Sequence, residues 1–244
     1  MKTMKTLQII TSRRYREFKD ILNSIANFKF LNTIKMKTMK TLQTLTLAVL
    51  FIGFTSCSSD DDNTPVPDPV QAELVSNLHA PQTGGQGQPI GGEFAKFDFE
   101  TGMQTTSDTD WDIAFRGTTI AVNGGTVTGT DDEPLRNGDA GATIATGTFA
   151  SITTAEGLTF LIDADGSFAI PTGSDNGWYN YNPQVRVITP IPGKILVFKT
   201  RDGNYAKVEI LSYYLDQDSS NPANGRYYTF NYVYNPNAGE TSFE

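Results

Sequence analysis

Sulfur and imidazole side chains are scarce in this sequence, and their scarcity excludes several kinds of site. The 244 residues include one cysteine and one histidine. A single cysteine excludes a disulfide framework, a four-cysteine zinc site within the chain and a Cys-x-x-Cys redox motif. A single histidine excludes an HExxH motif and metal centres that need several imidazoles. The sequence also lacks a GxSxG-type nucleophile motif, so it predicts a protein that is not an enzyme.

Positive charge is scarce beyond residue 56. Residues 1–56 hold ten Lys or Arg and two acids, which leaves 19 − 10 = 9 basic and 27 − 2 = 25 acidic residues for 57–244. The second part therefore carries a net charge of 9 − 25 = −16. An acidic surface repels phosphate backbones, so non-specific binding of nucleic acid is excluded.

The segment 41–56, TLQTLTLAVLFIGFTS, predicts a secretory signal peptide. It follows Lys37 and Lys40 and ends in small residues before a cysteine. Its apolar core of about 12 residues is typical of signal peptides. A membrane-spanning helix needs about 20 apolar residues, so this core is too short to span.

The residues around the expected cleavage point indicate a lipid anchor. Phe54-Thr55-Ser56-Cys57 resembles a bacterial lipobox in which Phe54 replaces the usual Leu. We therefore expect residues 36–56 to be a lipoprotein signal peptide and Cys57 to carry the lipid; an ordinary signal peptide with a chance cysteine is the alternative. Residues 57–71 are acidic and proline-rich, which predicts a disordered tether. An acidic run after a lipidated cysteine resembles the signal that places lipoproteins of Bacteroidota on the outer face of the outer membrane.

The peptide MKTMKTLQ occurs at residues 1–8 and again at 36–43. This duplication favours a translation start at Met36 or Met39. Residues 1–35 are then an upstream extension that the mature protein lacks. A basic amphipathic helix in this segment is the alternative.

Helical periodicity is missing from about residue 72 onward, where no window of 11 or more residues keeps apolar side chains at i, i+3, i+4 and i+7. Alternating or short apolar patterns instead predict strands at 94–100, 111–115, 158–162, 195–198, 205–214 and 226–234. Asp202-Gly203 lies between two of them and predicts a tight hairpin turn. The sequence thus predicts a single all-β domain over residues 72–244.

The last predicted strand has the clearest pattern. Tyr228, Phe230, Tyr232 and Tyr234 fall on one face, and the sequence therefore predicts an antiparallel meander of hairpins at the C-terminus. Residues 123–148 are rich in Gly, Thr and Asp and predict long loops or a poorly packed edge.

Residue chemistry alone gives few candidate sites. His79 has no nucleophile partner and is interpreted as a histidine bonded to backbone or water near the start of the domain. The acidic clusters at 108–112, 131–133 and 163–166 offer oxygen ligands for calcium. None completes a calcium loop, so we interpret them as solvated acids on turns and predict no metal site. Two tryptophans and nine tyrosines after residue 57 suit either packing or a flat apolar ligand.

Several segments together resemble one known family. They are Asp110-Trp-Asp-Ile-Ala-Phe115, Gly177-Trp178, the run from Ile195 to Val208 with its Asp-Gly-Asn turn, and Tyr228 to Pro236. In this order they are similar to the HmuY family of haem-binding lipoproteins of Bacteroidota, over about residues 90–236.

The resemblance implies two antiparallel sheets with long loops that hold haem. It also implies a non-catalytic, haemophore-like protein that is anchored in the outer membrane, faces the cell exterior and delivers haem to a TonB-dependent receptor for iron acquisition. A cofactor-free adhesin or an accessory subunit of such an uptake complex is the alternative.

The sequence departs from the family at the iron ligands. Known members use histidines or methionines, whereas this chain after residue 57 has only His79 and Met103. If haem binds, Tyr179 or Tyr181 after Trp178 is a candidate ligand, because tyrosinate can bind haem iron. The alternatives are iron without a protein ligand, or a loop adapted to another apolar ligand, a glycan or a protein partner. The candidate ligand-binding residues are therefore Tyr179, Tyr181, Trp178, His79 and Met103.

Overall fold

The structure is a computed structural model that describes residues 66–85 and 87–244. Within these ranges the chain forms strands and three short 3-10 helices but no α-helix, which confirms the all-β prediction. In the same ranges, no helix is both long and apolar enough to span a bilayer. The predicted upstream extension, signal peptide and Cys57, with the tether up to residue 65, lie outside the described residues.

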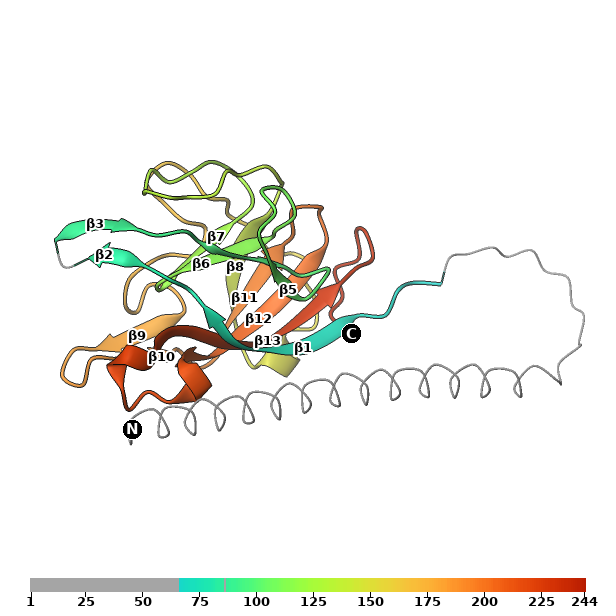
Figure 1. Cartoon of the computed structure of the whole chain (residues 1–244). Helices are drawn as coiled ribbons and strands as arrows, with labels where there is room; N and C mark the ends of the chain where they lie inside the picture. Colours follow the sequence, from blue (N-terminus) through green and yellow to red (C-terminus); the bar gives the residue numbers. More distant parts are fainter. Residues whose placement is uncertain (1–65, 86) are drawn as a thin grey trace, which may run out of the picture. The chain divides into compact units, whose positions relative to one another are not determined.

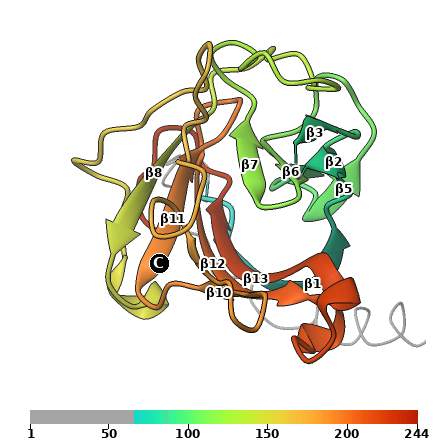
Figure 2. The same ribbon diagram turned by 90° about the vertical axis from the view of Figure 1, so that its left-hand side faces the viewer.

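Two larger antiparallel sheets form the body, and the described residues belong to one compact unit. The five-stranded sheet has the order β1 (Gln71–His79), β13 (Gly225–Asn235), β12 (Tyr205–Tyr214), β11 (Lys194–Lys199) and β8 (Gly141–Thr146). The four-stranded sheet has the order β5 (Met103–Thr105), β4 (Ala95–Asp98), β6 (Ile113–Arg116) and β7 (Thr119–Val122). Figure 2 shows the two sheets facing each other.

Two hairpins and three 3-10 helices complete the described part of the fold. The hairpins are β2 (Thr83–Gly85) with β3 (Gln88–Gly91) and β9 (Tyr179–Asn182) with β10 (Val187–Pro190), and both project on the same side of the body (Figure 1). The 3-10 helices are η1 (Phe149–Ser151), η2 (Leu215–Gln217) and η3 (Pro222–Asn224).

Aromatic side chains fill the space between the two sheets. Tyr228, Phe230, Tyr232 and Tyr234 of β13 are all buried on one face, as predicted. Phe97 of β4 packs edge-on against Phe230 and Tyr232, with ring centroids 5.5 and 5.8 Å apart. Such edge-to-face pairs stabilise a core by about 0.5–1.5 kcal/mol each beyond burial.

β11 is buried on both faces, which explains its continuous apolar sequence. Leu196 and Phe198 face the core between the sheets, whereas Ile195 and Val197 belong to a second cluster on the outer face of the five-stranded sheet. The segment after β8, including η1, and the C-terminal Phe243 cover this outer cluster. The meander β11–β12–β13 is confirmed, and Gly203 in its first turn has a φ of +91°.

One prediction for the middle of the chain is wrong. Residues 158–162 do not form a strand: Leu158 and Phe160 pack against the outer cluster, and Leu161 makes one isolated bridge to Ala142. Their apolar character reflects this covering role. The prediction of loops or an edge over residues 123–148 is confirmed, since 123–140 are mostly loop and β8 is an edge strand. These loops pack closely at Arg136, whose side chain is only 1 % exposed.

The interpretation of the acidic clusters as solvated is correct for Asp108, whose side chain is 94 % exposed, and wrong for Asp112, Glu133 and Asp163. Burial acts to raise the pKa of Glu133, but hydrogen bonds from Thr128 and Thr130 outweigh it and lower this pKa to about 2. A carboxylate of this kind can be buried because hydrogen bonds or ion pairs within the protein replace the hydrogen bonds that it would make with water.

Asp112 links the two sheets and makes stability depend on pH. One of its carboxylate oxygens accepts a hydrogen bond from the Phe99 N–H and the other from the Arg201 N–H, each at 2.9 Å. Burial raises the pKa of Asp112 from 3.8 to about 6, and these hydrogen bonds only partly oppose the shift.

We expect the free energy of unfolding of the wild type to fall by about 2–3 kcal/mol relative to an Asp112→Asn variant between pH 3.5 and pH 7. Between the two pKa values, the Asp112 carboxyl group is protonated in the folded state and ionised in the unfolded state. The resulting contribution of Asp112 to the free energy of unfolding is complete below pH 3.8, its pKa in the unfolded state, and is lost as the pH rises through about 6, its pKa in the folded state. Urea unfolding at four pH values measures the difference, and a difference that stays constant with pH contradicts the assignment.

The chain enters the domain at one end of β1. The Asp68 N–H donates to Asn237 Oδ1 at 2.9 Å, and Asn237 Nδ2 donates to the Asp68 carbonyl at 2.8 Å. Gln71, the last residue of the predicted tether, is already the first residue of β1 and pairs with Tyr234. These contacts fasten the start of the domain to the C-terminal end of β13.

Candidate functional site

A cleft lies where the far ends of β1, β12 and β13 meet β10. Its volume is about 420 Å³, within the range of about 300–1,000 Å³ that is usual for small-molecule sites. We call it the aromatic cleft, and its lining residues are His79, Arg186, Ile188, Tyr213, Tyr214, Pro222, Ala223, Gly225, Arg226 and Tyr227.

His79 reaches this cleft because β1 contains a bulge just before it. The register between β1 and β13 shifts between Val75 and Leu78, and Asn77 in the bulge has a φ of +59°. Asn77 and Asp216 exchange two hydrogen bonds of 2.8 Å, which fix this conformation. Such bulges commonly redirect a side chain at a functional site.

The His79 ring is exposed and stacks on Tyr227, its partner in the β1–β13 pairing. The ring centroids are 4.5 Å apart and the planes differ by 19°. This stack holds the imidazole at the mouth of the cleft. A neutral imidazole in such a position can ligate a metal, including haem iron.

Two consecutive tyrosines form the inner wall of the cleft. Tyr213 and Tyr214 are both buried at the end of β12, where a second register shift interrupts the alternation. The Tyr214 hydroxyl accepts a hydrogen bond of 2.8 Å from the Ile188 N–H and so ties β10 to β12. Burial raises the pKa of Tyr213, so this phenol stays protonated and contributes an aromatic surface rather than an anionic ligand.

Trp178 and Tyr179, two of the predicted site residues, belong to the core below this wall. Trp178 is 2 % exposed, donates from Nε1 to the Thr118 carbonyl at 3.0 Å and packs against Tyr213. Tyr179 is 8 % exposed, and its hydroxyl accepts a hydrogen bond from Thr118 Oγ1 at 3.3 Å. Both side chains hold the turn between β6 and β7 and support the cleft from beneath.

Tyr181 is the accessible tyrosine among the predicted ligands. It lies on β9 directly opposite Ile188 of β10, and its side chain is 44 % exposed. Paired residues in an antiparallel hairpin place their side chains on the same face, so Tyr181 lies beside the Ile188 wall of the cleft.

Met103 does not join His79. It pairs with Asp98 in the four-stranded sheet and is 63 % exposed, and the preceding Gly102 lies beside the Glu73 carboxylate. Glu73 is six residues before His79 on β1, a separation of roughly 20 Å. Two ligands of one metal ion lie within about 5 Å of each other because each metal–ligand bond is about 2 Å long. The structure therefore places Met103 and His79, both of which were candidate ligand-binding residues, too far apart to bind one metal ion.

The aromatic cleft carries only positive formal charges. Arg186 and Arg226 line it, and none of its lining residues is an acid. Residues 66–244 contain 9 basic and 22 acidic side chains, a net charge of 9 − 22 = −13, so this lining contrasts with the rest of the domain.

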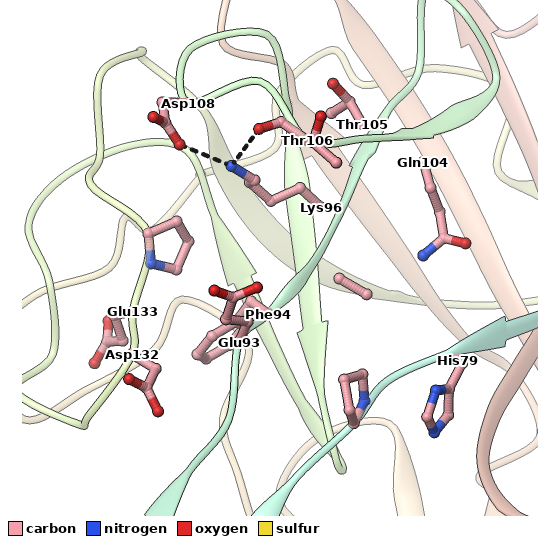
Figure 3. A pocket seen from close by; sticks show the side chains of 13 residues that line it. His79, Glu93, Phe94, Lys96, Gln104, Thr105, Thr106, Asp108, Asp132 and Glu133 are labelled. Carbon is pink, nitrogen blue, oxygen red and sulfur yellow. Dashed lines mark hydrogen bonds and ion pairs between the residues drawn. The ribbon is translucent and has the colours of Figure 1, made fainter.

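A larger cleft of about 690 Å³ shares His79 as a lining residue but has the opposite charge (Figure 3). We call it the acidic cleft because Glu93, Asp108, Asp132 and Glu133 line it. Its one basic residue, Lys96, is paired with Asp108 at 3.1 Å. Among the described residues, no group of three or more His, Cys, Asp or Glu is arranged to hold a metal ion. An anionic ligand therefore fits the aromatic cleft better, although that cleft is smaller.

Most residues that line the aromatic cleft were not predicted from the sequence. The tandem tyrosines Tyr213-Tyr214 and Tyr227-Tyr228 were a usable signal, because two adjacent aromatic residues break a strand's alternation. Nothing in the sequence marked Arg186 or Arg226, which lie on the β9–β10 turn and at the start of β13.

Comparison with known proteins gives one family match. Residues 92–232 match the family model described as HmuY protein. Among curated proteins, none matches this chain.

The solved structures that are similar to this chain include the following three. An apo HmuY analog from Tannerella forsythia has 15 % identity, a TM-score of 0.44, and coverage of 73 % of this chain and 100 % of its own. A Bacteroides fragilis protein described as a lipoprotein has 15 % identity, a TM-score of 0.40, and coverage of 73 % and 94 %. A Bacteroides vulgatus protein described as HmuY-like and heme-binding has 16 % identity, a TM-score of 0.40, and coverage of 69 % and 93 %.

Proposed function

The chain belongs to the HmuY family, and on this premise we propose that it binds haem or a related planar tetrapyrrole in the aromatic cleft without catalysing a reaction. The observation that carries the proposal is the exposed His79 imidazole at the mouth of a cleft whose inner wall is aromatic and whose charged residues are all basic. A haem molecule is a flat apolar ring with anionic propionate groups at one edge. An aromatic wall suits the ring, and a basic lining suits the propionates.

The residues present fit haem with one strong protein ligand to iron. If haem binds, His79 would supply an imidazole nitrogen to the iron, and Met103 is too far away to act with it. Tyr181 lies on the face of the β9–β10 hairpin next to Ile188, so its phenol is the second group that we test. Tyr179 would have to leave its buried position and its contact with Thr118 to reach iron.

We expect haemin titrated into the protein without its predicted signal peptide, residues 58–244, to produce a shifted Soret band at micromolar concentration. The His79→Ala variant should bind haemin at least tenfold more weakly, a loss of about 1.4 kcal/mol or more, because a coordinate bond is removed. Met103→Ala is the matched control, since Met103 lies roughly 20 Å from His79 by strand length and should leave the spectrum unchanged.

A wild-type protein without any Soret shift, oxidised or reduced, would remove haem from the proposal. If His79→Ala keeps the wild-type spectrum and affinity, His79 is not the ligand. A phenolate-to-iron band that disappears in Tyr181→Phe would assign that role to Tyr181.

The proposed biological role is haem uptake at the cell surface. A lipid on Cys57 would anchor the protein in the outer membrane facing the cell exterior, and a TonB-dependent receptor would accept the haem. The exposed Tyr181 and Val185 on the projecting β9–β10 hairpin support a protein contact of this kind. The same side chains also favour the second candidate, a cofactor-free adhesin or accessory subunit, which differs by showing no visible absorption with haemin while still co-purifying with a receptor.

A further inference from the structure

The two arginines of the aromatic cleft have most of their hydrogen-bonding capacity free. Within residues 66–85 and 87–244, neither Arg186 nor Arg226 forms a salt bridge. Arg226 donates from one guanidinium nitrogen to the Gln82 carbonyl at 2.7 Å. A guanidinium group has five N–H donors, so this bond orients Arg226 and leaves donors for a ligand.

Both arginines also occupy an unusual backbone conformation. The φ angles are +57° for Arg186 and +73° for Arg226. The left-handed region is sterically unfavourable for a residue other than glycine, and strained positions of this kind cluster at functional sites. The two side chains come from different elements, the β9–β10 turn and the start of β13, and line one cleft.

We infer that Arg186 and Arg226 recognise ionised carboxylates, so that the aromatic cleft selects planar ligands with free carboxylate groups over the same ring without them. This inference rests on the proposed function. Guanidinium–carboxylate hydrogen bonds are charge-assisted and can be bidentate, which gives them geometric specificity.

The acidic cleft strengthens this selection and orients the ligand. Its carboxylates lie beyond His79 and repel an anionic edge, whereas the arginines attract it. The carboxylate edge of the ligand therefore points to Arg186 and Arg226, and the ring lies against the tyrosine wall.

The test compares iron-free protoporphyrin IX with its dimethyl ester, because neither depends on an iron ligand. Binding to residues 58–244 is followed by quenching of protein fluorescence in the same low concentration of non-denaturing detergent. We expect the wild type to bind the free acid at least tenfold more tightly than the diester. In the double variant Arg186→Gln, Arg226→Gln this preference should fall below about threefold, while binding of the diester stays unchanged.

Lys199→Gln is the matched control. It removes one positive charge from β11, outside the aromatic cleft, and should keep the preference for the free acid. If Lys199→Gln loses the preference as well, the effect is one of net charge and the inference is wrong. Circular dichroism and thermal unfolding show whether the double variant is folded. If it is not folded, the relative affinity of the wild type for the free acid and the diester decides whether carboxylates are recognised.

The outcomes separate the inference from the proposed function. Equal binding of acid and diester by the wild type overturns carboxylate recognition and leaves tetrapyrrole binding in place. Absence of binding by both porphyrins and by haemin overturns the proposed function and the inference with it. A preference that survives in the double variant assigns recognition to other residues and also overturns the inference.

Discussion

Replacing Asp163 by alanine is expected to lower the free energy of unfolding by about 3–5 kcal/mol, because it removes one of the two buried carboxylates that pair with Arg136, the other being Glu133, and leaves two backbone N–H groups without a partner. The Asp163 side chain is fully buried and pairs with Arg136 Nη2 at 2.8 Å. Its oxygens also accept hydrogen bonds from the Val122 N–H at 3.1 Å and the Ala169 N–H at 2.8 Å. The variant therefore loses an ion pair and two backbone contacts that connect β7 to the loop 163–169.

Asp165→Ala provides the matched control for this experiment. Asp165 lies two residues further along, in the exposed turn, and its replacement should change the unfolding free energy by no more than about 0.5 kcal/mol. Chemical denaturation of both variants at neutral pH gives the comparison. Similar losses for the two aspartates would show that the buried network contributes no special stability.

Trp178→Ala is expected to cost about 3–5 kcal/mol as well, through the cavity that it leaves in the core. The Trp178 ring lies 4.9 Å from Tyr179, 5.9 Å from Tyr213 and 5.3 Å from Tyr228, measured between centroids. It also donates a hydrogen bond to the Thr118 carbonyl. Because Tyr213 is part of the cleft wall, ligand affinity should fall together with stability.

Tyr181→Ala separates packing from ligand contact near Trp178. Tyr181 is only three residues away but 44 % exposed, so its loss should change stability by about 0.5 kcal/mol or less. Any weakening of haemin binding in this variant would then reflect a direct contact with the ligand. A stability loss as large as that of Trp178→Ala would show instead that Tyr181 is part of the core.

Local patterns in the sequence predicted the C-terminal half of the large sheet. β11, β12 and β13 follow one another as hairpins, so apolar alternation and the Asp-Gly turn were sufficient to place them. The same reasoning could not find β1, whose sequence QAELVSNLH includes a bulge at Asn77 and pairs with β13 more than 140 residues away. Long-range pairing of this kind leaves no local signal.

The candidate site was predictable only in part for the same reason. His79 was recognised as the one imidazole after residue 57, but its stacking on Tyr227 depends on the β1–β13 pairing. Buried acids were missed because Asp163 and Arg136 lie 27 residues apart in Gly- and Thr-rich loops that look solvated. Trp178 and Tyr179 were found through family resemblance, and the structure gives them a supporting position beneath the cleft.

The clasp between Asp68 and Asn237 has a consequence for the direction in which the protein presents its ligand. It places the point of attachment of the preceding chain at the Gln71 end of β1, whereas His79 stands at the opposite end of the strand, roughly 25 Å away. In Figure 1 the two projecting hairpins lie on that distal side. If Cys57 carries the proposed lipid, the chain that joins this lipid to the domain enters at the Gln71 end of β1. The aromatic cleft, at the His79 end, then stays accessible to a protein that delivers or accepts haem.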